Sequence, residues 1–182
     1  MIRVLLIIFL SLIISNSIAS DQKDIIQYLK RINNFSFNFE QNINGKLENG
    51  NCIIQYPKKI HCKYNLKNKK ILVSNGRYLV IKTNKNHYIY PLKKTALNLI
   101  LDKNFLLNKI KTAEKRNVDD KFINYTFSEN DNEINIFFNK DNHKLVGWQT
   151  TDIYQNMNIT FISSIVENVE IEKNLFKLPI QN

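Results

Sequence analysis

The stretch FSFNFEQNI, residues 35–43, decides the fold of this chain. Its phenylalanines stand at every second position, Phe35, Phe37 and Phe39, and successive side chains of a β-strand point to opposite faces. The three rings therefore share one face of a predicted strand, and that face needs an apolar cover. The same period of two returns in most later segments, which predicts a sheet that encloses either a packed core or a lipophilic cavity.

Around this strand, short alternating segments are separated by turn-forming residues such as Asn44-Gly45 and Asn49-Gly50. Many short strands at close spacing are typical of an antiparallel barrel or a strongly curved sheet. Turns separate the predicted strands, which span residues 35–43, 50–56, 60–65, 70–74, 78–83, 87–90, 109–117, 121–128, 133–138, 143–153 and 157–165.

Two segments are predicted to be helical. Ile25, Ile26, Leu29 and Ile32 follow helical spacing, which predicts a short amphipathic helix over residues 22–32 with Asp21 as its N-cap. Residues 95–108 lose the period of two and contain a dense run of leucines. This central segment is predicted to interrupt the strands as a helical unit.

The chain begins with features of an export signal. Arg3 is followed by an almost wholly apolar run from Val4 to Ile14, and Ser17-Ile18-Ala19 resembles a signal-peptidase site. We expect residues 1–19 to be a cleavable signal peptide and residues 20–182 to form a single domain in the periplasm. An uncleaved N-terminal anchor is the alternative. No later run approaches the roughly 20 apolar residues that span a bilayer.

The chain is basic, with a formal net charge of +10. Such an excess is compatible with a nucleic-acid or anionic-lipid partner. The lysines are scattered, however, and they do not form the basic and aromatic platform of single-strand binders. The abundance of Asn, Ile, Lys and Tyr is also what AT-rich coding produces, so we predict no nucleic-acid partner.

Recognisable catalytic and metal motifs are absent from the sequence. His61, His87 and His143 lack the close spacing of a metal site, and two cysteines cannot build a zinc centre alone. Nucleotide-binding and nucleophile-elbow signatures are missing as well. We therefore expect no metal, no cofactor and no enzymatic activity, with a secreted hydrolase of dispersed catalytic residues as the alternative.

Cys52 and Cys62 flank the turn at Pro57. A hairpin register in which paired residue numbers sum to 114 places the two cysteines directly opposite each other on one face, at a distance that some cross-strand disulfides use. An oxidising compartment permits the bond. Two buried reduced thiols are the alternative, since a register change of one residue removes the pairing.

Side chains on the inner face of the predicted strands are candidates to line a cavity, and helical residues are candidates to cover it. Each is also an ordinary core position, so the set as a whole carries the cavity hypothesis. The lining candidates are Phe35, Phe37, Phe39, Ile54, Tyr56, Ile60, Leu72, Tyr78 and Val80. The lid candidates are Ile25, Ile26, Leu29, Leu97, Leu99, Ile100 and Leu101.

An ordered set of short segments resembles the outer-membrane lipoprotein carrier family LolA. The resemblance extends from about residue 22 to Pro179. It rests on Phe37 to Gln41, Gly50 seven residues before Pro57, Pro57 to Ile60 leading to Tyr64, Ile71 to Gly76, Tyr90-Pro91-Leu92 with Thr95, Leu97 to Leu101, and Phe176 to Pro179.

The resemblance implies an unclosed antiparallel half-barrel lidded by helices, whose apolar hollow holds the acyl chains of lipoproteins. It further implies a monomeric periplasmic chaperone that takes lipoproteins from an inner-membrane releasing transporter to an outer-membrane receptor. A related lipid-binding or lipoprotein-sensing protein of the same fold is the alternative. The chain departs from the family pattern at Tyr56, where many members have an arginine implicated in handing the lipoprotein onward.

Overall fold

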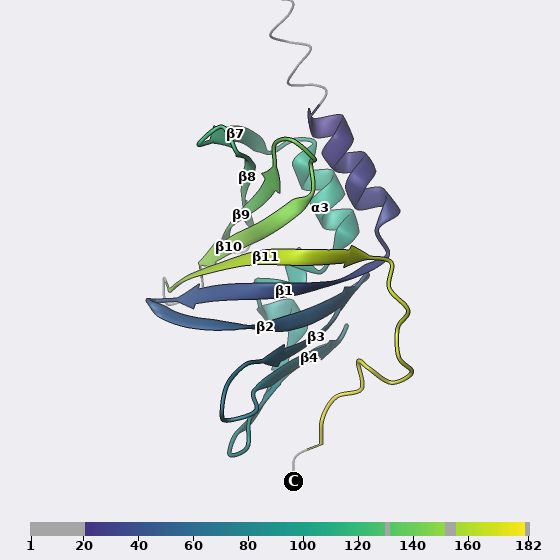
Figure 1. Cartoon of the computed structure of the whole chain (residues 1–182), viewed down its shortest axis with the longest axis vertical. Helices are drawn as coiled ribbons and strands as arrows, with labels where there is room; N and C mark the ends of the chain where they lie inside the picture. The colour runs from purple at the N-terminus through teal and green to yellow at the C-terminus, as the bar shows by residue number, and fades with distance from the viewer. Residues whose placement is uncertain (1–20, 130–131, 152–155, 181–182) are drawn as a thin grey trace, which may run out of the picture.

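The computed structural model describes residues 21–129, 132–151 and 156–180, and within them eleven strands form one antiparallel sheet (Figure 1). The predicted signal peptide lies outside the described residues. The strands are β1 (Asn34–Ile43), β2 (Lys46–Gln55), β3 (Lys59–Tyr64), β4 (Ile71–Asn75), β5 (Tyr78–Lys82), β6 (His87–Pro91), β7 (Glu114–Val118), β8 (Phe122–Glu129), β9 (Asn132–Asn139), β10 (Leu145–Thr151) and β11 (Met157–Glu167).

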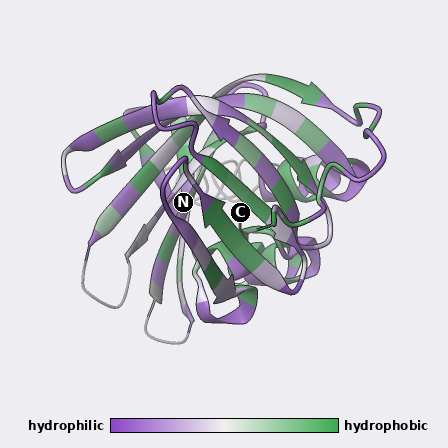
Figure 2. Ribbon diagram, turned by 90° about the horizontal axis from the view of Figure 1, so that it is seen from below, coloured by the Kyte–Doolittle hydropathy of each residue, from purple (hydrophilic) through white to green (hydrophobic). Residues whose placement is uncertain are grey.

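The sheet is open. Its order is β6-β5-β4-β3-β2-β1-β11-β10-β9-β8-β7, so β6 and β7 are its two edges, and the first and last strands of the chain pair at its centre. Figure 2 shows the strands curving through an arc, with hydrophobic and hydrophilic residues alternating along most of them. The predicted mainly β, unclosed half-barrel is confirmed.

Helices lie on the concave side of the arc. The N-terminal helix is described over residues 21–31, close to its predicted range. The predicted central helical segment is divided into α2 (Leu97–Ile100) and α3 (Lys103–Ile110), and a short helical piece outside the predicted range, η1 (Leu92–Lys94), precedes them. None of the helices in the described part of the chain is both long and apolar enough to cross a bilayer.

Asp102 separates the last two helical pieces. Its backbone is extended, and its carboxylate accepts a hydrogen bond from the backbone N–H of Phe105 at 3.1 Å, so it caps the start of α3. Because α3 continues to the buried Ile110, the strand predicted over residues 109–117 was wrong in its first half. Lys109 and Lys111 around Ile110 mimic strand alternation, but Ile110 is also spaced four residues from Leu106 on one helix face.

Asn49-Gly50 is not a turn, because β2 passes straight through it. Gly50 lies opposite both Phe39 of β1 and Tyr64 of β3. A Cβ atom at this position would meet the backbone oxygen of Lys63 at 2.1 Å and the ring of Phe39 at 2.9 Å. Glycine is therefore needed for close approach of the neighbouring chain segments.

Asp21 was predicted as a helix cap, but the helix already includes it. Its carboxylate instead accepts hydrogen bonds from Lys115 of β7 at 2.6 Å and from His143 at 3.1 Å. Burial raises the pKa of Asp21, but the hydrogen bonds from Lys115 and His143 outweigh this effect and hold the pKa below its ordinary value. These two hydrogen bonds attach the N-terminal helix to β7 and to the connection between β9 and β10.

The C-terminal segment crosses the convex face of the sheet near β3 to β6. Phe176 is buried there and has the Lys59 ammonium 5.9 Å from its ring centroid. Farther along, the backbone oxygen of Pro179 lies 3.0 Å from the imidazole of His87, and that of Ile180 accepts from Lys82 at 2.7 Å. Part of the convex face is consequently covered as well, although Ile89 on β6 stays exposed.

Candidate functional site

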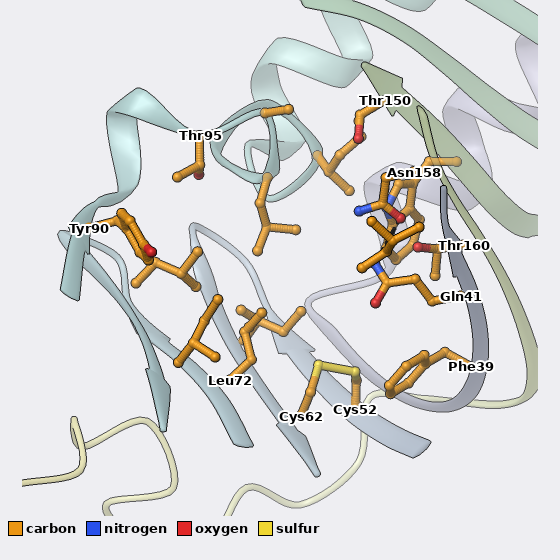
Figure 3. A pocket seen from close by; sticks show the side chains of 18 of the residues that line it. Phe39, Gln41, Cys52, Cys62, Leu72, Tyr90, Thr95, Thr150, Asn158 and Thr160 are labelled. Carbon is orange, nitrogen blue, oxygen red and sulfur yellow. Dashed lines mark hydrogen bonds between the residues drawn. A yellow bond between two sulfur atoms is a disulfide. The ribbon is translucent and has the colours of Figure 1, made fainter. Parts of the chain in front are cut away.

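A pocket of about 480 Å³ lies on the concave face of the sheet, within the range of typical small-molecule sites. Its floor is built from side chains that alternate inward along five neighbouring strands. Figure 3 shows this floor, in which Leu72 and the Cys52–Cys62 disulfide lie below the opening. The apolar floor and walls comprise Phe37, Phe39, Ile43, Cys52, Ile60, Cys62, Leu72, Leu79, Ile81 and Trp148.

Aromatic contacts hold one side of the floor in place. The ring of Phe37 packs edge-on against Trp148 of β10 at 6.2 Å, and the ring of Phe39 packs edge-on against Tyr64 at 4.9 Å. Such pairs add about 0.5–1.5 kcal/mol beyond their area burial. Burial also raises the pKa of Tyr64, which keeps its hydroxyl protonated at neutral pH.

The disulfide lies in the floor of the pocket. Cys52 of β2 is directly opposite Cys62 of β3, in the register predicted from the sequence, and their sulfur atoms are bonded at 1.99 Å. Both cysteines are buried and line the pocket. The bond therefore joins two adjacent strands of the pocket floor.

The helical pieces η1 and α2 cover the pocket. They and the residues between them contribute Lys94, Thr95, Ala96, Leu97 and Ile100 to its lining. The backbone N–H of Lys58, in the β2–β3 turn, donates to the carbonyl of Leu101 at 2.9 Å, and its ammonium pairs with Asp102 at 3.2 Å. These contacts attach the lid to the sheet beneath it.

One wall of the pocket is polar. It is formed where β1, β11 and β10 run side by side, and Figure 3 shows Gln41, Thr150, Asn158 and Thr160 gathered there, across the opening from Tyr90. Gln41 donates from Nε2 to Oδ1 of Asn158 at 2.8 Å. Asn156 lines the same pocket. The pocket is thus apolar over most of its surface and polar along one side.

The predicted lining residues divide into three groups. Phe37, Phe39, Ile60 and Leu72 line the pocket. A second group, Phe35, Ile54 and Tyr56, belongs to or packs against the adjoining hydrophobic core and does not line it. The third group, Tyr78 and Val80, lies on the other face of the sheet.

Tyr78 and Val80 were wrongly assigned to the cavity. Leu79 and Ile81 line the pocket, so Tyr78 and Val80, which alternate with them on β5, point to the convex face. Val80 is paired with Val73 there, while Tyr78 is partly exposed. In this strand the alternation of apolar and polar residues could not identify the inner face, because both faces carry apolar side chains.

The predicted lid residues lie in different places. Leu97 and Ile100 line the pocket, whereas Leu99 and Leu101 are buried in the core. Residues 21–31, the described part of the N-terminal helix, do not contribute to the lining. Its residues Ile25 and Leu29 are buried in the core, and Ile26 packs against it, because the helix covers a different part of the sheet.

The sequence analysis missed several lining residues. Leu79 and Ile81 had a signal in the register, since Ile81 is directly opposite the correctly assigned Leu72 and opposed residues share a face. Trp148, Gln41, Thr150, Asn158 and Thr160 had no local signal that marks a pocket. They meet only because β1 pairs with the last strand of the chain.

Tyr56 occupies the position where many family members have an arginine, and the ammonium group of Lys103 lies close to it. The Lys103 ammonium of α3 lies 5.7 Å from the centroid of the Tyr56 ring and donates to the carbonyl of Ile32 at 2.8 Å. A positive charge thus stands beside this position, although it comes from a distant part of the sequence. Burial raises the pKa of the Tyr56 hydroxyl, so it stays neutral.

The pocket has few titratable groups in its lining. Its described lining contains no histidine, aspartate or glutamate, and Lys94 is its charged residue. His143 does pair with a carboxylate, that of Asp21, but beside the N-terminal helix. Across the described ranges, no group of three or more His, Cys, Asp or Glu side chains is arranged to hold a metal ion.

The fold and the site together define a class of protein, an open antiparallel half-barrel with an apolar pocket under a short helical lid. The particular family follows from the sequence. Residues 30–179 match the family model described as "Outer membrane lipoprotein carrier protein LolA", and the chain belongs to this family. No curated protein matches the sequence significantly.

Three solved structures illustrate what the chain is similar to. A LolA superfamily protein from Nitrosomonas europaea has 8% sequence identity and a TM-score of 0.48, with 88% of this chain and 97% of that chain covered. The lipoprotein LppX from Mycobacterium tuberculosis has 13% identity and a TM-score of 0.45, with coverage of 84% and 97%. A putative outer membrane lipoprotein-sorting protein domain from Vibrio parahaemolyticus has 6% identity and a TM-score of 0.46, with coverage of 88% and 94%.

Proposed function

We propose that this chain is a periplasmic carrier that binds the acyl chains of lipoproteins in the pocket under η1 and α2 and transports them from the inner to the outer membrane. The observation that supports the proposal best is the pocket itself, which has an apolar floor, a volume of about 480 Å³ and a lid of two short helical pieces. Membership of the LolA family agrees with this role.

Burial of hydrocarbon explains why such a carrier needs a pocket. Each CH₂ group moved from water to an apolar site gains about 0.8 kcal/mol, so a chain of about 16 carbons gains on the order of 12 kcal/mol. Free diffusion of a lipoprotein across an aqueous gap is therefore prohibitive. In the pocket, the acyl chain exchanges one apolar environment for another, so that transfer to and from a membrane stays close to balance.

The remaining parts of the proposal follow from the sequence and the family. Residues 1–19 direct export and are removed, and residues 20–182 form the carrier domain, which acts as a monomer. Its partners are acylated lipoproteins, an inner-membrane transporter that releases them and an outer-membrane receptor that accepts them. The function requires no cofactor and no covalent chemistry, so the protein is not an enzyme.

The pocket hypothesis is tested by filling the pocket from one strand and leaving the other face of the sheet as the control. Ile81 lines the pocket, whereas Ile89 on the neighbouring strand is exposed and pairs with Val80, which faces away. Ile81→Trp should exclude roughly three CH₂ groups of a guest chain, at about 0.8 kcal/mol each, and so weaken binding roughly 50-fold. Ile89→Trp should leave the affinity unchanged.

The measurement is the affinity of the purified chain for a synthetic S-diacylglyceryl-cysteine peptide, by fluorescence titration. Circular dichroism and thermal unfolding check that both variants are folded. Equal affinities of the wild type and the folded Ile81→Trp variant would contradict acyl binding in this pocket. A loss of affinity in Ile89→Trp alone would place the binding surface on the convex face instead.

A further inference from the structure

The polar wall of the pocket is not explained by hydrocarbon binding. Two residue pairs make it up, and each pair spans two neighbouring strands. Gln41 of β1 is directly opposite Thr160 of β11, and Asn158 of β11 is directly opposite Thr150 of β10. All four side chains line the pocket. They form one compact patch, named here the amide–hydroxyl patch.

Thr160 is the least satisfied member of this patch. The side chain is 4% exposed, and its Oγ1 atom has no hydrogen-bond partner among the described residues. Most buried polar side-chain atoms have a partner, and an unmade hydrogen bond in a buried place is costly. A hydroxyl both donates and accepts one hydrogen bond or more. In a residue that lines a pocket, this pattern points to a partner that belongs to the ligand.

The chemistry of the patch restricts that partner to a neutral group. Gln41, Asn158, Thr150 and Thr160 carry amides and hydroxyls, and none of them is charged. Anionic phosphates and carboxylates are bound in proteins chiefly by Arg, Lys or clusters of backbone N–H groups. Lys94 belongs to the lid and not to this wall. An uncharged donor patch suits a carbonyl oxygen.

We propose that the amide–hydroxyl patch binds the ester or amide carbonyl groups that join acyl chains to the polar end of a lipoprotein. This inference rests on the proposed function and deepens it, because it names the part of the ligand that the polar wall recognises. The Thr160 hydroxyl donates to one carbonyl oxygen while the attached hydrocarbon extends over the apolar floor toward the disulfide. The patch therefore sets how deeply a chain enters the pocket.

The test compares two probes that differ only in the carbonyl groups, 1,2-dioctanoylglycerol and its 1,2-dioctyl ether analogue. Wild-type protein should bind the ester more tightly than the ether by about 3- to 10-fold, the effect of one typical net hydrogen bond. Thr160→Val keeps the shape of the side chain and removes the hydroxyl. It should bind both probes with the affinity that the wild type shows for the ether.

Two further variants control the experiment. Thr95 lines the same pocket, but its hydroxyl already donates to the carbonyl of Leu92 at 2.8 Å. Thr95→Val should therefore keep the preference for the ester. Thr160→Ser retains a hydroxyl at the tested position and should restore the preference that Thr160→Val loses. Affinities come from displacement of a fluorescent fatty acid, with unfolding curves recorded for every variant.

The outcomes separate this inference from the proposed function. A wild-type protein that binds neither probe contradicts the proposed function. A protein that binds both probes with equal affinity retains the proposed function and overturns the role of the patch. The inference is also overturned if folded Thr160→Val loses affinity for ester and ether alike, because the carbonyl group then makes no difference.

Discussion

The two halves of the sheet are built from the same alternating strands but differ in what occupies their concave faces. The half from β7 to β11, named here the filled half, is occupied by the N-terminal helix and α3, and its strands β10 and β11 border the pocket. The half from β1 to β6, named here the hollow half, is covered by η1 and α2. The helices make the difference, because α3 has eight residues and α2 only four.

The filled half is packed solidly. Ile25 and Leu29 of the N-terminal helix are fully buried, and so are Ile123, Tyr125 and Phe138 of the sheet. The two helices and the sheet are also joined directly. Gln22 donates to the carbonyl of Ile110 at 2.9 Å, Lys109 pairs with Glu129 at 2.8 Å, and the rings of Phe105 and Phe127 pack at 5.5 Å.

The hollow half has an equally apolar inner face but too little helix to fill it. Phe37, Phe39 and Leu79 cover their strands, yet a pocket remains beneath the lid. An apolar strand face therefore does not by itself specify a packed core. The length of the segment that covers the face decides whether a core or a cavity results.

The largest expected effect is the stability difference between matched leucine deletions in the two halves. Leu29→Ala in the filled half leaves a void in a packed core and should lower the free energy of unfolding by about 2–5 kcal/mol. Leu72→Ala in the hollow half enlarges an existing pocket and should cost about 1 kcal/mol. Urea denaturation measures both, and equal losses would contradict the division into filled and hollow halves.

The disulfide is the next largest stabilising feature, and it lies in the hollow half. It closes a loop between residues separated by ten positions, which stabilises the folded chain by about 2–3 kcal/mol through the entropy of the unfolded state. The double variant Cys52→Ala/Cys62→Ala should lose this amount in urea denaturation. Wild-type protein should lose a similar amount when a reductant is added, and the double variant should not respond to it.

A smaller change in stability, this time a gain, is expected when Thr160 is replaced. Replacing an unsatisfied buried hydroxyl by a methyl group removes a desolvation penalty, so Thr160→Val should stabilise the ligand-free protein by about 1 kcal/mol. Thr126→Val is the matched control away from the pocket, because the Thr126 hydroxyl already donates to Asn135. This control should be destabilising. A loss of stability in Thr160→Val would mean that the hydroxyl has a partner within the folded protein.

The smallest effect concerns acid stability in the filled half. Because the pKa of Asp21 is lowered in the folded protein, its pairing stabilises the fold above its ordinary pKa of 3.8, and this contribution is lost as the pH falls through the folded value. Asp21→Asn should cost at most about 1 kcal/mol at pH 7, and the difference from the wild type should shrink toward pH 3.

The exposed pair of Asp120 with Lys140 is the control for this experiment. Asp120→Asn should change stability little at any pH, because exposed ion pairs contribute little. Thermal unfolding of the wild type and both variants between pH 3 and pH 7 measures the effect. A cost of Asp21→Asn that grows on acidification would contradict the sign of the predicted shift.

Much of the sheet was predictable, and the failures have local causes. Strand alternation placed Phe37, Phe39 and Leu72 on the concave face, where they line the pocket, and the turn at Pro57 predicted the register of the cysteines. In β5 the alternation was uninformative, because the C-terminal segment helps to cover the second face. Asn49-Gly50 was interpreted as a turn because glycine after asparagine is common in turns. The actual role of Gly50 is close packing against Phe39 and the backbone of Lys63, which lie on neighbouring strands and cannot be recognised locally.

The amino-acid sequence alone was enough to predict a mainly antiparallel β-sheet with one apolar face, because the alternation of side chains along a strand is a local property. Only the tertiary structure decided which part of that face is core and which is pocket. It also brought Gln41 and Thr160 together, although 118 residues separate them, because the first and last strands pair at the centre of the sheet. Helix coverage and strand order are non-local, so no short stretch of the sequence contains them.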